Sequence, residues 1–112
     1  MKIYHNPRCS KSRQTLALLQ ENGVEPEVVL YLENIPTTEE LKDLLSKLEI
    51  SPMQLIRIGE KDWKENYKGK ELSDAQIIEA MIAHPKLIER PIVVKDTKAV
   101  LGRPPENALE LL

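Results

Sequence analysis

The sequence predicts a single α/β domain, residues 1–112, built on a four-stranded mixed sheet. Its first part has the pattern strand, helix, strand, and its last part has the pattern strand, strand, helix. Helical patterns fill about 36–86 between them, so we expect a core of 1–35 and 87–112 that carries a helical insertion. The length of 112 residues, 41% of them hydrophobic, is enough for one domain with its own apolar core.

The elements of the first part follow from local signals. Residues 2–4 form the first predicted strand, which ends before Pro7 because proline lacks an amide donor. A helix is expected over about 9–22, with Gly23 just past its end, where a left-handed residue is favoured. The apolar run 28–32 predicts a strand buried on both faces, and the three elements together predict a parallel βαβ unit.

Two strong helix starts bound the insertion. Thr37 with Glu40, and Ser73 with Gln76, form capping boxes ahead of apolar residues at helical spacing, and the second helix must end before Pro85.

The stretch between those helices is less regular. Ser51-Pro52 predicts a short helix that carries residues 55–57. Residues 59–72 are rich in charge and predict a loop or irregular helix, in which Trp63 and Tyr67 fit either local packing or a partner-binding patch.

The last part predicts a hairpin and a closing helix. Residues 92–94 and 99–101 are the two strands, with a tight turn at 96–98. Pro104 and Pro105 then begin a helix that bears Leu109 and Leu112.

The composition excludes several classes of protein. The chain has 16 Lys and Arg against 18 Asp and Glu, a net charge of −2, and one Trp, three Tyr and no Phe. We expect no nucleic-acid binding, because both a basic field and a set of stacking aromatics are lacking. The longest apolar run, 28–32, is far shorter than the roughly 20 residues of a membrane span, and residues 2–7 do not resemble a signal peptide. A cytoplasmic protein is therefore expected, without a membrane partner.

The single cysteine, Cys9, restricts the thiol chemistry. An internal disulfide and a zinc site of several thiolates are both impossible, and we expect no bound cofactor or metal. Cys9 stands at a predicted helix start, where free N–H groups and the helix dipole favour a thiolate. Arg8, Arg13 and His5 surround it in the sequence and favour the thiolate further, so a reactive thiol is predicted. The alternative is a small buried side chain with no chemical role.

The spacing around Cys9 argues against two thiol chemistries. A cysteine-based phosphatase loop needs Cys-x5-Arg, whereas Cys9 and Arg13 give Cys-x3-Arg. A dithiol pair needs Cys-x-x-Cys, and Ser12 occupies the second position. Ser10 and Ser12 can cap the helix or bind an oxyanion, with capping favoured for Ser10. A single nucleophile beside an anion-binding helix start remains.

Several segments together resemble the glutaredoxin-dependent arsenate reductase family, and its short oxidoreductase subgroup above all. The resemblance covers essentially the whole chain and rests on Ile3 to Arg13 (Ile-Tyr-His-Asn-Pro-Arg-Cys-Ser-Lys-Ser-Arg), Val29 to Leu32, Arg57, Arg90 to Val94, and Gly102-Arg103-Pro104. It implies a thioredoxin-like fold with a helical insertion and a cis peptide bond before Pro91.

The resemblance also implies residue roles. Cys9 would be the nucleophile and His5 would support its thiolate form. Arg57, Arg90 and Arg103 would hold the oxyanion, and we expect Arg8, Ser12 and Arg13 to support the site.

The implied reaction is reduction of arsenate to arsenite through a thioarsenate on Cys9. Glutathione is the expected co-substrate and glutaredoxin the expected partner of a monomeric enzyme, because one thiol cannot complete the reduction alone. Two alternatives stay open. One is a redox or regulatory protein of the same fold that binds RNA polymerase, although Ser12 removes the Cys-x-x-Cys switch of such sensors. The other is a thiol reductase for another oxyanion.

Overall fold

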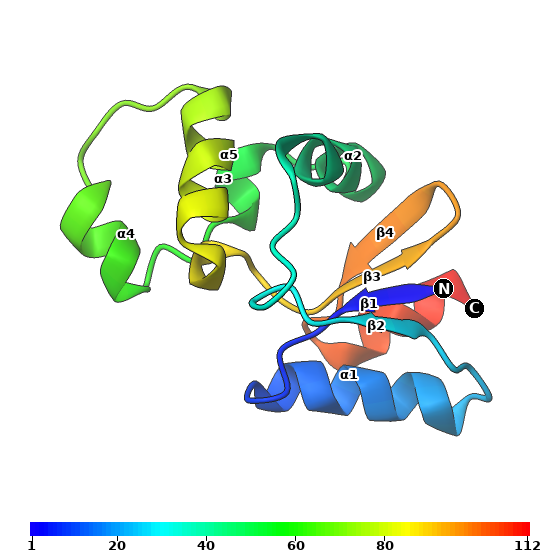
Figure 1. Ribbon diagram of the computed structural model, residues 1–112. Helices are drawn as coiled ribbons and strands as arrows, with labels where there is room; N and C mark the ends of the chain where they lie inside the picture. Colours follow the sequence, from blue (N-terminus) through cyan, green and yellow to red (C-terminus); the bar gives the residue numbers. More distant parts are fainter. The chain divides into compact units, whose positions relative to one another are not determined.

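The computed structural model describes residues 1–112 and divides into two compact units (Figure 1). Residues Met1–Asn34 and Arg90–Leu112 form the sheet unit, and residues Ile35–Glu89 form the helical unit. The assignment of both units to one domain stays a prediction. No helix combines the length and the apolar character needed to cross a membrane.

The sheet unit contains four strands: β1 (Lys2–Tyr4), β2 (Glu27–Val29), β3 (Ile92–Lys95) and β4 (Lys98–Leu101). Their order in the sheet is β2-β1-β3-β4. Strand β1 runs parallel to β2 and antiparallel to β3, which pairs with β4 as a hairpin. The predicted four-stranded mixed sheet, its parallel βαβ unit and its hairpin are confirmed.

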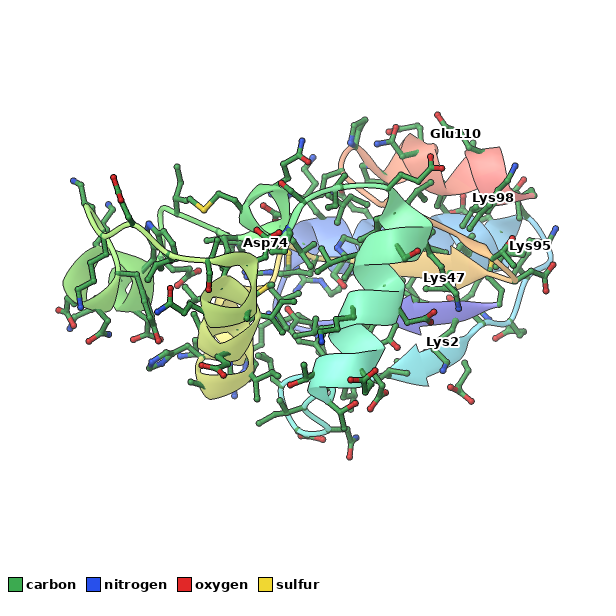
Figure 2. All side chains as sticks on the ribbon, turned by 90° about the horizontal axis from the view of Figure 1, so that it is seen from above. Lys2, Lys47, Asp74, Lys95, Lys98 and Glu110 are labelled. Atoms are coloured by element: carbon green, nitrogen blue, oxygen red, sulfur yellow. The ribbon has the colours of Figure 1, made fainter.

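The strand register brings distant segments to one end of the sheet. Tyr4 pairs with both Val29 and Ile92, and Ile92 pairs with Leu101. The segments that follow β1, β2 and β4, and the one that precedes β3, therefore leave the sheet at the same end. The hairpin turn lies at the opposite end, where Lys95, Lys98 and Glu110 are labelled in Figure 2. These three residues border a surface hollow.

Two helices cover one face of this sheet. They are α1 (Ser10–Glu21) and the 3-10 helix η2 (Pro105–Leu111), which pack against each other. Their core is fully apolar and comprises Ile3, Leu19, Val93, Ala108 and Leu111, none more than 6% exposed. Burial of a large aliphatic side chain stabilises a fold by roughly 1.5–3 kcal/mol, so this cluster anchors α1 to the sheet.

The predicted closing helix is present as the 3-10 helix η2. Leu109 and Leu112 are 38% and 50% exposed, whereas Ala108 and Leu111 face the core.

The prediction for the second strand was wrong in its bounds and its burial. Strand β2 ends at Val29, and the backbone turns at Leu30, whose carbonyl accepts hydrogen bonds from the amides of Glu33 and Asn34. Because β2 lies at the edge of the sheet, Val28 is 43% exposed. The apolar run continues inward only at Tyr31, which is 1% exposed.

The helical unit contains α2 (Thr38–Leu48), α3 (Pro52–Leu55), α4 (Lys61–Asn66), α5 (Asp74–Ala83) and the 3-10 helix η1 (Pro85–Leu87). Helix α5 contacts α2, α3 and η1. The capping boxes predicted from Thr37 with Glu40 and from Ser73 with Gln76 are both present. Helix α2 buries Leu41, Leu44 and Leu45 along one face, as the leucine spacing predicts.

The irregular stretch of the helical unit brings two corrections. Helix α3 ends at Leu55, because Ile56 forms an isolated β-bridge with Ile88 and so leaves the helix. Helix α4 occupies part of the stretch predicted as loop or irregular helix. Trp63 is only 7% exposed and stacks on Tyr67 with ring centroids 5.4 Å apart, which favours local packing over a partner-binding patch.

Candidate active site

Cys9 is itself the N-cap residue of α1. Its backbone is extended (φ −95°, ψ 122°), its amide donates to the Asn6 carbonyl at 3.0 Å, and its carbonyl accepts from the Arg13 amide at 3.0 Å. No side chain caps this helix, so the prediction that Ser10 acts as the cap was wrong; Ser10 is the first helical residue. The thiol therefore stands at a helix start whose first-turn N–H groups have no side-chain acceptor, an environment that favours an anion.

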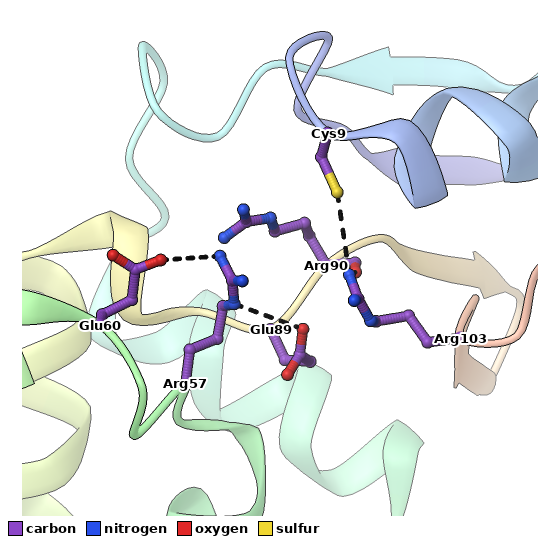
Figure 3. A network of polar contacts seen from close by, with 6 residues as sticks. All are labelled: Cys9, Arg57, Glu60, Glu89, Arg90 and Arg103. Atoms are coloured by element: carbon purple, nitrogen blue, oxygen red, sulfur yellow. Dashed lines mark hydrogen bonds and ion pairs between the residues drawn. The ribbon is translucent and has the colours of Figure 1, made fainter.

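Arg103 brings positive charge to the thiol. Its Nη1 lies 3.8 Å from Cys9 Sγ and donates to the Arg90 carbonyl at 3.2 Å (Figure 3). The strand register explains why Arg103 lies near Cys9 and Arg90. Arg103 follows β4 and Arg90 precedes β3, and both are at the end of the sheet where the loop that carries Cys9 begins. The guanidinium is thus placed within hydrogen-bond reach of the sulfur.

The backbone around these arginines is fixed by two prolines. The Arg90-Pro91 peptide bond is cis, as the resemblance implies, and the Arg103-Pro104 bond is cis as well. Arg90 is partly buried and Arg103 is exposed.

His5 and Ser12 hold the loop that carries Cys9. His5 is 6% exposed, and its Nδ1 lies 2.6 Å from Ser12 Oγ, which also accepts from the Asn6 amide at 3.1 Å. Burial, with the charge of Arg13 as the second cause, lowers the pKa of His5 below its ordinary value of 6.5. Because that pKa lies below 6.5, the ring is mainly neutral at pH 7, and its contact with Ser12 holds the loop. Ser12 fills a position that a dithiol enzyme would give to a second cysteine.

Arg13 and Arg8, the other two residues predicted to support the site, make different contacts. Arg13 Nη1 donates to the Pro7 carbonyl at 2.9 Å and so closes the loop from the α1 side. Arg8 is exposed, and its amide donates to Asn6 Oδ1 at 3.0 Å. Asn6 thus braces the loop through both its side chain and its backbone.

Thr15 and Gly102 form a junction that sequence reasoning missed. Thr15 is fully buried in α1, and its Oγ1 lies 2.8 Å from the Lys11 carbonyl and 3.0 Å from the Gly102 carbonyl. A Cβ on Gly102 would lie 2.7 Å from Thr15 Cγ2 and 2.8 Å from Pro91 Cγ, so only glycine fits. The Gly102 amide also donates to the Pro91 carbonyl at 2.9 Å. The junction fixes α1, Pro91 and the residue before Arg103 against one another.

Comparison with known proteins agrees with this arrangement. Residues 4–111 match the ArsC family. The chain belongs to the ArsC family. It is 46% identical to an arsenate reductase of Haemophilus influenzae over 112 residues, covering 98% of this chain and 97% of that protein. It is also 56% identical to the uncharacterized protein YfgD of Escherichia coli K12, covering 100% of this chain and 96% of that protein.

A solved ArsC structure gives the same result for the fold. An arsenate reductase from Vibrio cholerae superimposes with a TM-score of 0.95 at 51% identity, covering 99% of this chain and 96% of that chain. The predicted thioredoxin-like α/β fold and membership of the arsenate reductase family are confirmed, and the dependence on glutaredoxin stays a prediction. The prediction of an oxidoreductase enzyme is confirmed by family membership, because the ArsC relatives include proteins named arsenate reductase.

Arg57, the remaining arginine implied by the ArsC resemblance, lies in the helical unit. Its amide donates to the Leu87 carbonyl at 2.8 Å, while the Glu89 amide donates to the Leu55 carbonyl at 2.8 Å. These two bonds set Arg57 beside Glu89, whose Oε1 lies 3.6 Å from Nε, and Glu60 Oε1 lies 2.9 Å from Nη1 (Figure 3). The guanidinium thus has two carboxylate partners, and its role in oxyanion binding stays a prediction. The ArsC chain has no cluster of three or more His, Cys, Asp or Glu side chains suited to a metal ion.

Proposed function

We propose that this protein reduces arsenate to arsenite, with Cys9 as the nucleophile and with glutathione and glutaredoxin as the reductants. The observation that carries the proposal is the position of Cys9 at the uncapped start of α1, with Arg103 Nη1 3.8 Å from its sulfur. Family membership supports arsenate as the substrate, since relatives 40–56% identical include proteins named arsenate reductase.

In the first step the Cys9 thiolate attacks arsenic(V) and an oxygen leaves as water. The arsenic stays pentavalent and a sulfur–arsenic bond forms. Arginine donors stabilise negative charge on the arsenate oxygens, and the first-turn N–H groups of α1 can contribute to the same task. Arg103 and Arg90 are the two arginines of the sheet unit assigned to this role, and Arg57 is the third proposed donor.

The remaining steps need outside thiols, because the chain has no second cysteine. Glutathione condenses on the arsenic with loss of a second water. The glutaredoxin thiolate then attacks the glutathione sulfur, which leaves as a mixed disulfide while the electron pair of the sulfur–arsenic bond reduces arsenic(V) to arsenic(III). Hydrolysis of the last Cys9–arsenic bond releases arsenite and restores the thiol. We place this reaction in the cytoplasm, where glutathione keeps thiols reduced, and assign it to the monomer.

The test is arsenite production from arsenate with glutathione and glutaredoxin. We expect turnover by the natural protein and none by Cys9→Ser. Lys98→Ala, at the opposite end of the sheet, is the matched control and should react at the natural rate. Equal activity in Cys9→Ser and the natural protein, or none in either, contradicts the proposal. Protection of Cys9 from alkylation by phosphate or sulfate but not by arsenate would point to a different oxyanion.

A further inference from the structure

A pocket of about 300 Å³ lies on the sheet unit beside the loop that carries Cys9. Its lining comes from two segments, one after β1 and one after β2, and comprises His5, Asn6, Pro7, Arg8, Leu30, Leu32 and Glu33. The two segments are neighbours because β1 and β2 are parallel and Tyr4 pairs with Val29, so both leave the sheet at the same end. The volume is at the lower end of the range for small-molecule sites, roughly 300–1,000 Å³.

The pocket has opposite charges on its two segments. Arg8 and Glu33 are exposed, and neither side chain makes a hydrogen bond or an ion pair with the protein. Their backbones are nonetheless fixed, because the Arg8 amide donates to Asn6 Oδ1 at 3.0 Å and the Glu33 amide donates to the Leu30 carbonyl at 3.0 Å. Leu30 and Leu32 are partly buried and supply an apolar wall. The pocket thus offers one cationic and one anionic group beside an apolar surface.

We propose that this pocket binds the small peptide thiol that completes the reaction of Cys9. Such a molecule carries a carboxylate, which Arg8 would bind in bidentate fashion, and an ammonium group, which Glu33 would bind. Its apolar portions would lie against Leu30 and Leu32. The inference rests on the proposed function, because it names where that reaction's thiol co-substrate sits.

The place of the pocket in the chain fits this role. Arg8 immediately precedes Cys9, and adjacent Cα atoms are about 3.8 Å apart. Cys9 itself does not line the pocket, so we expect a peptide thiol held at Arg8 to extend its sulfur out of the pocket toward the thioarsenate on Cys9. The arsenate oxygens are assigned to a different set of cations, Arg90 and Arg103, so oxyanion and thiol do not compete for one guanidinium.

Binding is tested without arsenate, using S-methylglutathione as an unreactive probe and amide chemical shifts as the readout. We expect saturable shifts in the amides of His5, Asn6 and Arg8 and of residues 30–33. Arg8→Ala and Glu33→Gln should each weaken binding about three- to fivefold, as expected for an exposed charge pair worth about 0.6–1 kcal/mol. Arg8→Glu should weaken it more, because it repels the carboxylate. Lys98→Ala removes one exposed positive charge at the hairpin turn and should bind like the natural protein.

Kinetics supply the second readout. Arg8→Ala and Glu33→Gln should raise the KM for glutathione, whereas the rate with 2-mercaptoethanol, which lacks both charged groups, should change less. Lys98→Ala should leave the KM for glutathione, the KM for arsenate and the rate with 2-mercaptoethanol unchanged. Shifts that map elsewhere, or variants that bind S-methylglutathione like the natural protein, would overturn the inference even if arsenate is reduced. Conversely, if the protein binds the probe in this pocket but reduces no arsenate, the proposed function is wrong and the assignment of the pocket to a peptide thiol still holds.

Discussion

The two units of the protein use polar side chains in opposite ways. The sheet unit buries four of them, His5, Asn6, Ser12 and Thr15, all within the loop before α1 or in α1 itself. The helical unit buries none; its polar side chains cap helices at the surface, as Thr37 and Ser73 do. Burial of a polar group costs free energy unless it is hydrogen-bonded. The sheet unit accepts that cost next to its only thiol, which is where position must be fixed most closely.

The largest expected effect is a loss of stability when one carbon is added at the junction of Thr15 and Gly102 in the sheet unit. Gly102→Ala should destabilise the fold by about 1–3 kcal/mol, because its Cβ would lie under 3 Å from Thr15 and Pro91. Gly59→Ala in the helical unit is the control, since its added Cβ meets nothing within 4 Å. Urea unfolding of both variants measures the difference. Equal stability of the two would show that the junction is not tightly packed.

Thr15 in the sheet unit and Thr37 in the helical unit allow buried and surface polar side chains to be compared directly. Thr15→Val removes a buried hydroxyl from the Lys11 and Gly102 carbonyls and should cost about 1–3 kcal/mol, together with a slower reaction of Cys9. Thr37→Ala removes a surface cap and should cost about 0.5–2 kcal/mol, with no change in Cys9 reactivity. Thr15→Ser keeps the hydroxyl and should restore the alkylation rate in iodoacetamide assays. An alkylation rate in Thr15→Val equal to that of the natural protein would contradict a positioning role.

Substitution of Arg103 in the sheet unit and of Arg57 in the helical unit should have different effects on Cys9. Arg103→Ala should slow Cys9 alkylation at pH 7 roughly 1.4- to fivefold, the effect of an exposed charge pair of about 0.2–1 kcal/mol. Arg103→Lys should recover part of the rate. Arg57→Ala should leave alkylation unchanged and raise the KM for arsenate if Arg57 holds the oxyanion. An unchanged arsenate KM would remove Arg57 from the proposed site.

The smallest effect is a dependence of stability on pH. The pKa of His5 is lowered in the folded state, so the unfolded chain binds its proton first as pH falls below about 6.5. Stability should therefore fall on acidification from that pH down to the folded pKa and be fully present above it. His5→Gln should lack this component. Free energies of unfolding at pH 7.5 and 5.5 test the sign, and a natural protein that gains stability relative to His5→Gln at pH 5.5 would refute it.

Local signals in the sequence were enough for much of the fold. Proline, glycine and the capping boxes marked the helices, and two short apolar runs separated by a turn marked the hairpin. The apolar run 28–32 misled because residue type cannot tell an edge strand from a central one; that difference depends on which strands pair. The end of α3 was missed for a similar reason, since the partner of Ile56 lies at Ile88.

In the candidate site, too, local features could be predicted from the sequence and contacts between distant residues could not. The position of Cys9 at a helix start could be predicted from Pro7 and the residues that follow. The bond between Thr15 and Gly102 joins residues 87 positions apart, and no local pattern announces it. The contact of His5 with Ser12 also depends on how the loop folds back onto α1.

The positions of Trp63 and Cys9 give each of the two units a probe of its own. Trp63 is the only tryptophan, it lies in the helical unit, and it is buried against Tyr67. Its fluorescence therefore reports on the unfolding of residues 35–89, while the rate at which a thiol reagent labels Cys9 reports on the sheet unit. Coincident transitions of the two signals would mean that both units unfold as one cooperative domain, and separate transitions would mean two.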